Sequence, residues 1–284
     1  MSVVAALGCL LLLGGDCSRA RVESMDHMNQ GVAYAQQKRF IEAIKALQQS
    51  TVVDPTNDQA FYNLAIVHIE MQQFERAREA LQSAINGDPR VAGYYEKLGT
   101  VAMELEDWDS ARSAFEQAIV IEPELFKAYY KLAQVLEQAD EPQQALHQYT
   151  EAIQRGPRFI EAYVSLGRLY YDLGFYSESA QVLLGGLRVV LPGTDEKADL
   201  HPMLGAVYQE QDRYDSAIEE FRSALELSPG MRDALFSLGW AHSLKGNRED
   251  ARHYLSKFVD LAGADAPQHY LKAARDRIAE LEQL

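Results

Sequence analysis

Proline recurs along this chain at a fixed interval. Pro55, Pro89, Pro123 and Pro157 are 34 residues apart, and Pro229 follows after twice this interval plus four residues. A constant period of this length is typical of repeat proteins, in which each unit contacts only its neighbours. The sequence therefore predicts an array of similar structural units in place of one globular core.

The segment from 92 to 125 illustrates the unit, and we number its positions as places one to thirty-four, starting at Ala92. Small residues occupy place eight (Gly99) and place twenty (Ala111), with bulky side chains between them, such as Trp108 at place seventeen. Small side chains allow two helices to approach closely. The unit is therefore predicted to be a helical hairpin.

The same pattern extends along most of the chain, since place eight holds only Gly or Ala and place twenty only Ala or Ser. After the fifth unit, four additional residues (194–197) follow a Gly185-Gly186 pair. A loop insertion without consequence and a flexible joint are both compatible with this, and we favour the first. The seven predicted units within 21–265 are 24–57, 58–91, 92–125, 126–159, 160–193, 198–231 and 232–265.

The last segment, 266–284, has a different pattern. Leu271, Ala274, Ile278 and Leu281 form one apolar stripe at helical spacing, and charged residues occupy the other positions. A solenoid needs a polar surface at its end. This segment is therefore predicted to be a capping helix.

The seven units resemble tetratricopeptide repeats, a family of 34-residue helix-turn-helix units. The resemblance extends from 24 to 265. It implies an all-α fold, a right-handed α-solenoid of seven hairpins followed by the capping helix. It also implies that the first helices line a concave groove, into which places two, five, six, nine, twelve and thirteen point.

The first twenty residues have the character of an export signal. Residues 3–13 form an apolar run of 11 residues, too short to span a bilayer and of the right length for a signal-peptide core. Both cysteines of the chain, Cys9 and Cys17, lie in this segment, so the repeats contain no thiol. We predict that 1–20 is a signal peptide.

Cys17 resembles the lipid-attachment cysteine of bacterial lipoproteins, because it closes the apolar run and follows Gly14-Gly15 closely. Asp16 departs from the lipoprotein pattern, which has a small residue directly before the cysteine. Cleavage near Ala20 and a start codon assigned too late are the alternatives.

Several classes of partner are disfavoured. A formal net charge of −15 makes nucleic acid an unfavourable partner, because phosphate binding depends on clustered Lys and Arg. No polybasic segment is present, so membrane contact is predicted through the N-terminal lipid only. His27, His68, His201 and His242 occupy packing places and are predicted to have core or boundary roles. We find no catalytic or phosphate-binding motif, and therefore predict no enzyme activity, metal, cofactor or small-molecule substrate.

The predicted groove carries several apolar and aromatic side chains. Exposed aromatic residues are costly unless a partner covers them, although curvature can also bury them against the next first helix. The candidate protein-binding residues are Met28, Val32, Tyr62, Asn63, Ile66, Ile69, Tyr130, Lys131, Gln134, Arg168, Tyr171, Phe236 and Trp240.

The kind of partner can be narrowed by comparison with a known mode of binding. Family members that hold a terminal carboxylate use Lys and Asn in one unit, Asn in the next and two basic residues in the third. In the first three units here, only Asn63 and Lys97 correspond to this set. An apolar or amphipathic protein segment is therefore the predicted partner.

An export signal followed only by these repeats resembles the outer-membrane lipoproteins that assist secretin assembly in type IV pilus and motility systems, the pilotins. The resemblance implies a non-enzymatic scaffold with lipid at Cys17 and secretin subunits as partners. It would lie at the periplasmic face of the outer membrane, or in the periplasm if not lipidated. A general periplasmic adaptor, or a regulatory subunit that presents substrates to a separate envelope enzyme, are the alternatives.

Overall fold

The computed structural model describes residues 3–190, 197–262 and 267–283. Within these ranges every regular element is a helix, which confirms the predicted all-α class. The helices are α1 (Val3–Gln36), α2 (Phe40–Val53), α3 (Asp58–Glu70), α4 (Phe74–Gly87), α5 (Ala92–Glu104), α6 (Trp108–Ile121), α7 (Phe126–Gln138), α8 (Pro142–Arg155), α9 (Ile160–Asp172), α10 (Tyr176–Val189), α11 (Lys197–Glu210), α12 (Tyr214–Leu227), α13 (Arg232–Lys245), α14 (Arg248–Leu261) and α15 (Gln268–Gln283).

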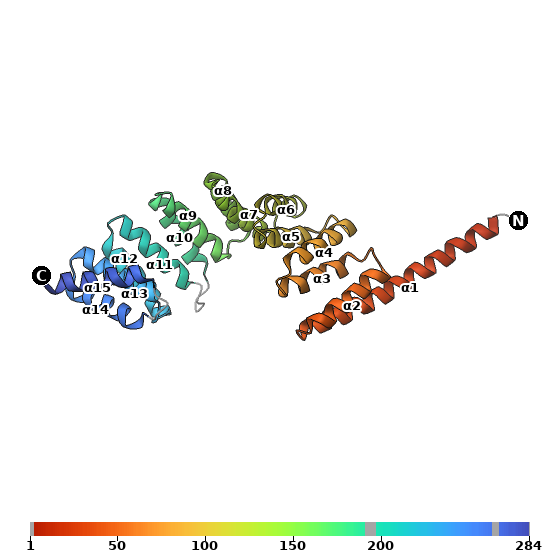
Figure 1. The fold of residues 1–284 in the computed structure, drawn as a ribbon. Coiled ribbons are helices and arrows are strands. Elements are labelled where there is room, and N and C mark those ends of the chain that lie inside the picture. The colour runs from red at the N-terminus through yellow and green to blue at the C-terminus, as the bar shows by residue number, and fades with distance from the viewer. Residues whose placement is uncertain (1–2, 191–196, 263–266, 284) are drawn as a thin grey trace. The chain divides into compact units, whose positions relative to one another are not determined.

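The helix boundaries follow the 34-residue period. The first helices α3, α5, α7, α9 and α13 begin at place one, and the even-numbered helices from α2 to α14 begin at place seventeen. Successive helices pack together from α1 to α7 and from α9 to α15, for example α1 with α2 and α3 with α4. Figure 1 shows these helices following one another along the chain. The hairpin predicted from place eight and place twenty is therefore the structural unit.

The turn inside each hairpin depends on one residue in a left-handed conformation, which is always at place fifteen. The amide of the next residue donates to the carbonyl of place eleven, as Gln73 N does to His68 O over 2.8 Å. This bond satisfies a carbonyl at the end of the first helix. The left-handed residues are Lys38 (φ 60°), Gln72, Glu106 and Asp140 (57°), Gly174 (79°), Asp212 (56°) and Gly246 (88°).

Glycine at place eight lets the two helices of a hairpin touch. A Cβ added at Gly99 would lie 2.7 Å from the ring of Phe115, and one at Gly205 would lie 2.6 Å from the ring of Phe221. Both rings are fully buried, so they have no free space into which to move. The close approach predicted from the small residues is therefore present.

The described chain divides into two compact units, Met1–Ala145 and Leu146–Leu284. In the N-terminal unit, the core contains Leu47 from α2, Leu81 from α4 and Val101 from α5. A buried polar contact ties its first three helices together: Ser24 Oγ donates to Ser50 O over 2.9 Å, and Asn57 Nδ2 donates to Ser24 Oγ over 2.9 Å. The fold therefore holds α1 firmly from Ser24 onward.

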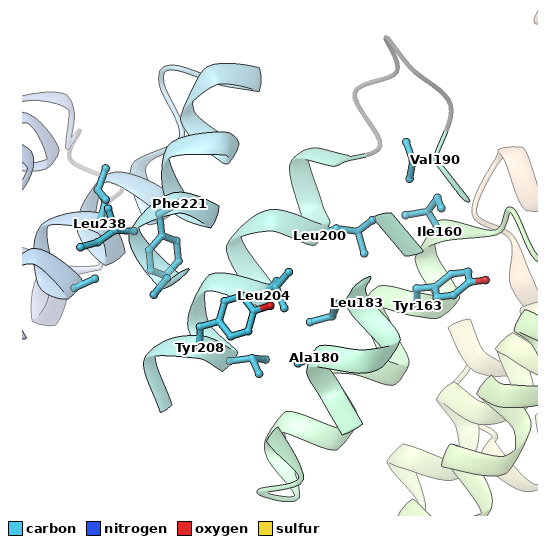
Figure 2. Packing of buried hydrophobic residues seen from close by; sticks show 14 residues of the cluster. Ile160, Tyr163, Ala180, Leu183, Val190, Leu200, Leu204, Tyr208, Phe221 and Leu238 are labelled. Atoms are coloured by element: carbon cyan, nitrogen blue, oxygen red, sulfur yellow. The ribbon is translucent and has the colours of Figure 1, made fainter. Parts of the chain in front are cut away.

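The C-terminal unit has a core that extends across the insertion. Leu183 and Val190 precede the insertion, and they belong to one buried cluster with Leu200 and Leu204, which follow it (Figure 2). A Cβ at Gly186 would meet Leu200 and Tyr163 at 3.0 Å, so this glycine serves close packing. Residues 191–196 lie outside the described residues. The shared core favours a loop insertion over a flexible joint.

Helix α15 packs against α14, in the position that a first helix takes after the second helix of the preceding hairpin. Leu271, Ala274 and Leu281 are buried, and Ile278 packs against the core formed with α13 and α14. The predicted apolar stripe is thus the packed side of this helix. Its remaining surface is largely polar, as expected for a cap.

The predicted signal segment forms the beginning of α1, and the backbone of Cys17 lies within that helix. Within the part of the chain that the structure describes, no helix combines the length and apolar character needed to cross a membrane.

Candidate partner-binding face

We use the term first-helix face for the side chains at places five, six, nine, twelve and thirteen of the first helices. On α3 these places include Tyr62, Asn63, Ile66 and Ile69, and all four side chains are half-buried. Places five, nine and twelve recur at helical spacing and share one side of a helix. The repeat pattern therefore brings the predicted residues of α3 together.

Tyr62 is held by the next first helix. Its ring lies 5.0 Å from the ring of Tyr94 on α5, and the hydroxyl of Tyr94 donates to Asp58 over 2.5 Å. Burial, reinforced by the nearby Glu96 carboxylate, raises the pKa of Tyr62. The curvature effect expected for an exposed aromatic thus applies here, and only part of Tyr62 remains open to a partner.

On α7, the three predicted residues form a local polar group. Lys131 Nζ donates to Gln134 Oε1 over 3.0 Å, and Gln134 Nε2 donates to the Tyr130 hydroxyl over 3.2 Å. The Lys131 ammonium also lies 5.8 Å from the centre of the Tyr130 ring. This part of the face is therefore polar and already hydrogen-bonded.

The prediction differs from the structure at the first helix. Met28 is buried in the core of the N-terminal unit, with only 9% of its surface exposed, while Val32 is half-buried. Met28 packs with Leu47 and Leu64 in one cluster. The prediction that Met28 lines a binding groove does not fit this burial, because its side chain is enclosed by its own hairpin and the next.

In the C-terminal unit, Tyr171 on α9 reaches across to α11. Its hydroxyl donates to Glu210 Oε1 over 3.4 Å, and the Tyr176 hydroxyl donates to Glu210 Oε2 over 3.5 Å. Burial, together with the Glu210 carboxylate, raises the pKa of Tyr171 to about 12. Arg168 on the same helix is exposed. Tyr171 therefore positions a carboxylate on the first-helix face.

Phe236 and Trp240 lie together on α13. Their rings are stacked at 5.6 Å, and Phe236 also contacts Phe258 at 5.3 Å and Tyr270 at 4.9 Å. Phe236 packs on α15 as Tyr62 packs on α5, because an aromatic at place five meets a ring on the next first helix. Trp240, one turn later, is half-buried.

Three features of this face were not predicted from the sequence. Glu210 is held by two tyrosines, Leu244 is 45% exposed at place thirteen of α13, and Arg277 Nε donates to Ser243 Oγ over 2.5 Å. Place thirteen was included in the predicted groove, so Glu210 and Leu244 could have been found from the pattern. The contact of Arg277 depends on the packing of α15.

The histidines at place eleven are packing residues, as predicted for His68 and His242. His68 Nδ1 lies 2.8 Å from Gln73 Oε1, and His242 Nδ1 lies 3.3 Å from Asn247 Nδ2. Both rings are buried. Among the described residues, no group of three or more His, Cys, Asp or Glu side chains is placed to hold a metal ion.

Comparisons with known sequences agree with the geometry of the hairpins. A family model described as tetratricopeptide repeat matches residues 34–98 and 208–274, and a second model with the same description matches residues 130–188. The chain belongs to the tetratricopeptide repeat family. This fold is a scaffold for protein interaction. A comparison with curated proteins gives no match.

Several solved structures are similar to this chain. MamA is 26% identical, with a TM-score of 0.54, over 56% of this chain and 93% of MamA. Pseudomonas aeruginosa pilF is 19% identical, with a TM-score of 0.60, over 75% of this chain and 96% of pilF. YrrB, described as having an unusual peptide-binding site, is 22% identical, with a TM-score of 0.55, over 68% of this chain and 97% of YrrB.

Proposed function

We propose that this tetratricopeptide repeat protein is a non-enzymatic, pilotin-like envelope lipoprotein that assists assembly of an outer-membrane secretin in a type IV pilus or motility system. The observation that carries the binding role is the first-helix face, where aromatic and apolar side chains remain partly open in both units. Such side chains provide most of the energy of protein interfaces. The partner contacts them through an apolar or amphipathic segment.

The attachment to the membrane rests on the sequence around Cys17. Cys17 lies seven residues before Ser24, the first residue that the hairpin contacts hold. Seven helical residues span about 10 Å. A lipid on Cys17 would therefore keep the first hairpin close to the membrane surface, at the periplasmic face of the outer membrane.

The likeness to pilF supports only the fold, because the identity is 19%. The proposal of a pilotin role therefore depends on the combination of a lipoprotein-like signal with a chain made of repeats. A general periplasmic adaptor, or a regulatory subunit for a separate envelope enzyme, would share these features and differ in the partner.

The test of the partner is cross-linking in envelope fractions, followed by mass spectrometry. We expect secretin subunits to be cross-linked to the wild-type protein, and Tyr62→Ala with Trp240→Ala to reduce the yield. Recovery of motor proteins or hydrolases in place of secretin would contradict the pilotin role and favour one of the alternatives.

The test of the anchor is membrane sedimentation of a Cys17→Ser variant. We expect this variant to move from the membrane pellet to the soluble periplasmic fraction. Cys9→Ser is a matched control, because Cys9 lies in the same apolar segment and has no predicted lipid. Sedimentation of Cys17→Ser with the membrane, as for the control, would exclude a lipid at Cys17.

A further inference from the structure

Three apolar side chains follow one another along α13 at intervals of four residues: Phe236, Trp240 and Leu244. Residues spaced by four lie on one side of a helix. We call this set the α13 stripe. Leu244 is 45% exposed and the other two are half-buried, so the stripe is open to solvent along its length.

The α13 stripe is fixed in position by neighbouring helices of the C-terminal unit. Phe236 is packed against Phe258 on α14 and Tyr270 on α15, and Trp240 is stacked on Phe236. On the other side, α11 packs against α13. The aromatic side chains are therefore already ordered, which lowers the entropy cost of binding a partner.

The helices that precede α13 end in carboxylates at place thirteen. Asp172 is the last residue of α9 and Glu210 the last residue of α11, in the place that Leu244 occupies on α13. Both side chains are exposed, and no ion pair is found for either among the described residues. Basic residues stand at other places, such as Arg168 at place nine of α9.

These carboxylates are unfavourable for the helices that carry them. The C-terminal end of a helix has a partial negative charge, so an acid there costs about 0.3–1 kcal/mol compared with a neutral residue. The carboxylate of Glu210 is nevertheless held by the Tyr171 and Tyr176 hydroxyls. A carboxylate that is held in position and has no ion pair among the described residues is suited to a cation supplied by a partner.

We propose that the α13 stripe docks an amphipathic segment with a basic edge, whose apolar side chains contact Trp240 and Leu244 and whose Lys or Arg side chains meet Asp172 and Glu210. The inference deepens the proposed scaffold role and rests on the use of the first-helix face. It adds the charge of the partner and its place on the C-terminal unit.

The test uses Trp240 as the reporter. The chain has two tryptophans, so Trp108→Phe leaves Trp240 as the only one. The probes are two synthetic 18-residue amphipathic peptides with the same pattern, one of Leu and Lys and one of Leu and Glu. We expect the Leu/Lys peptide to shift Trp240 emission to the blue and to bind at least about tenfold more tightly, with an affinity that falls as salt is added.

Matched variants separate binding at the α13 stripe from nonspecific binding of the peptides. Leu244→Ser, and Asp172→Asn with Glu210→Gln, should each weaken Leu/Lys binding by about tenfold. Leu261→Ser on α14 is the control for the apolar change, because Leu261 is 48% exposed and lies outside the stripe. Glu226→Gln, on α12, is the control for the charge change. Unchanged thermal midpoints will show that these variants remain folded.

The inference would be overturned by equal binding of the Leu/Lys and Leu/Glu peptides, or by an equal loss of binding in Leu261→Ser and Leu244→Ser. Absence of any Trp240 shift with either peptide would overturn it as well. These results are independent of the secretin test. A failure to cross-link secretin would leave the measured peptide binding unchanged. A failure to bind the Leu/Lys peptide would likewise leave the cross-linking result unchanged.

Discussion

The N-terminal and C-terminal units build the same hairpin with different residues at its two most demanding places. At place fifteen the N-terminal unit uses only residues with side chains, such as Lys38 and Gln72, whereas the C-terminal unit has Gly174 and Gly246. At place eight the N-terminal unit has Ala65 and Ala133 beside two glycines, whereas the C-terminal unit has glycine throughout. The same backbone is therefore reached with and without glycine.

The difference shows that a left-handed turn does not need glycine when the packing on both sides fixes it. A residue with a Cβ in this conformation costs roughly 1–2 kcal/mol, and the two packed helices must supply this energy. The N-terminal unit therefore carries strain in its turns that Gly174 and Gly246 avoid in the C-terminal unit.

The largest effect should come from filling place eight at positions where both units have glycine. Gly99→Leu and Gly205→Leu would each drive a side chain into a buried phenylalanine ring, at a cost of about 1–3 kcal/mol. Urea denaturation will measure it. Gly93→Leu is the control, because Gly93 lies on the same helix as Gly99 and has no atom within 4 Å of an added Cβ. If one of these two substitutions left the urea midpoint unchanged, the two units would also differ in how tightly place eight is packed.

A smaller effect is expected at place fifteen of the C-terminal unit. Gly246→Ala meets no atom within 4 Å, so its whole cost, about 1–2 kcal/mol, comes from the left-handed backbone. Gly230→Ala is the control, since that site is equally open and its φ is not in the left-handed range. Equal urea midpoints for Gly246→Ala and Gly230→Ala would contradict an energetic cost of the left-handed backbone at Gly246.

The opposite change should relieve strain in the N-terminal unit. Gln72→Gly removes the Cβ from a left-handed residue, but glycine also gains freedom in the unfolded chain. We therefore expect a net stabilisation below about 1 kcal/mol, seen as a higher urea midpoint. Gln117→Gly, at an exposed position inside α6, should instead lose about 0.5–1 kcal/mol. Destabilisation by Gln72→Gly would mean that the turns of the two units are equally relaxed.

The smallest effect concerns His242, the buried histidine at place eleven of α13. Burial, with the nearby Arg222 and Lys245 charges, lowers the pKa of His242, while Asp250 acts in the opposite direction. The ring also stacks on Tyr254 at 5.6 Å, and its buried Nε2 has no hydrogen-bond partner among the described residues.

Because the unfolded chain binds a proton at His242 more readily than the folded chain, the contribution of this residue to stability is complete above about pH 6.5 and decreases as the pH falls. Urea midpoints at about pH 7.5 and pH 5.5 will measure the loss. His242→Gln should reduce the difference between the two midpoints. An unchanged difference in His242→Gln would assign the acid sensitivity to other groups.

Most of the fold could be predicted from the sequence because period, small residues and aromatic places all repeat. The small residues at places eight and twenty predicted where the two helices of each hairpin touch, and the period predicted that this contact recurs along the chain. The turn residue could not be predicted, because Lys38, Gln72 and Glu106 carry no sign of a left-handed conformation. Their geometry comes from the two helices that they join.

The candidate face could be predicted less completely. The repeat numbering predicts which side of each first helix a residue occupies, but it does not predict how deeply its side chain is buried. Met28 was therefore predicted to line the groove, although its own hairpin buries it. The environment of Phe236 depends on Tyr270, which lies beyond the last full unit. Contacts between neighbouring units therefore decide which residues of the pattern stay open.

The exposed side of α15 also bears on how an array of these repeats could be lengthened by design. Helix α15 presents Lys272, Arg275 and Asp276 to solvent, where a packed hairpin would need an apolar surface. A hairpin placed against this side would bury these charges, which costs free energy unless each of them is paired. A longer array built from these repeats should therefore gain its hairpins before Gln268 and keep α15 as its outer helix.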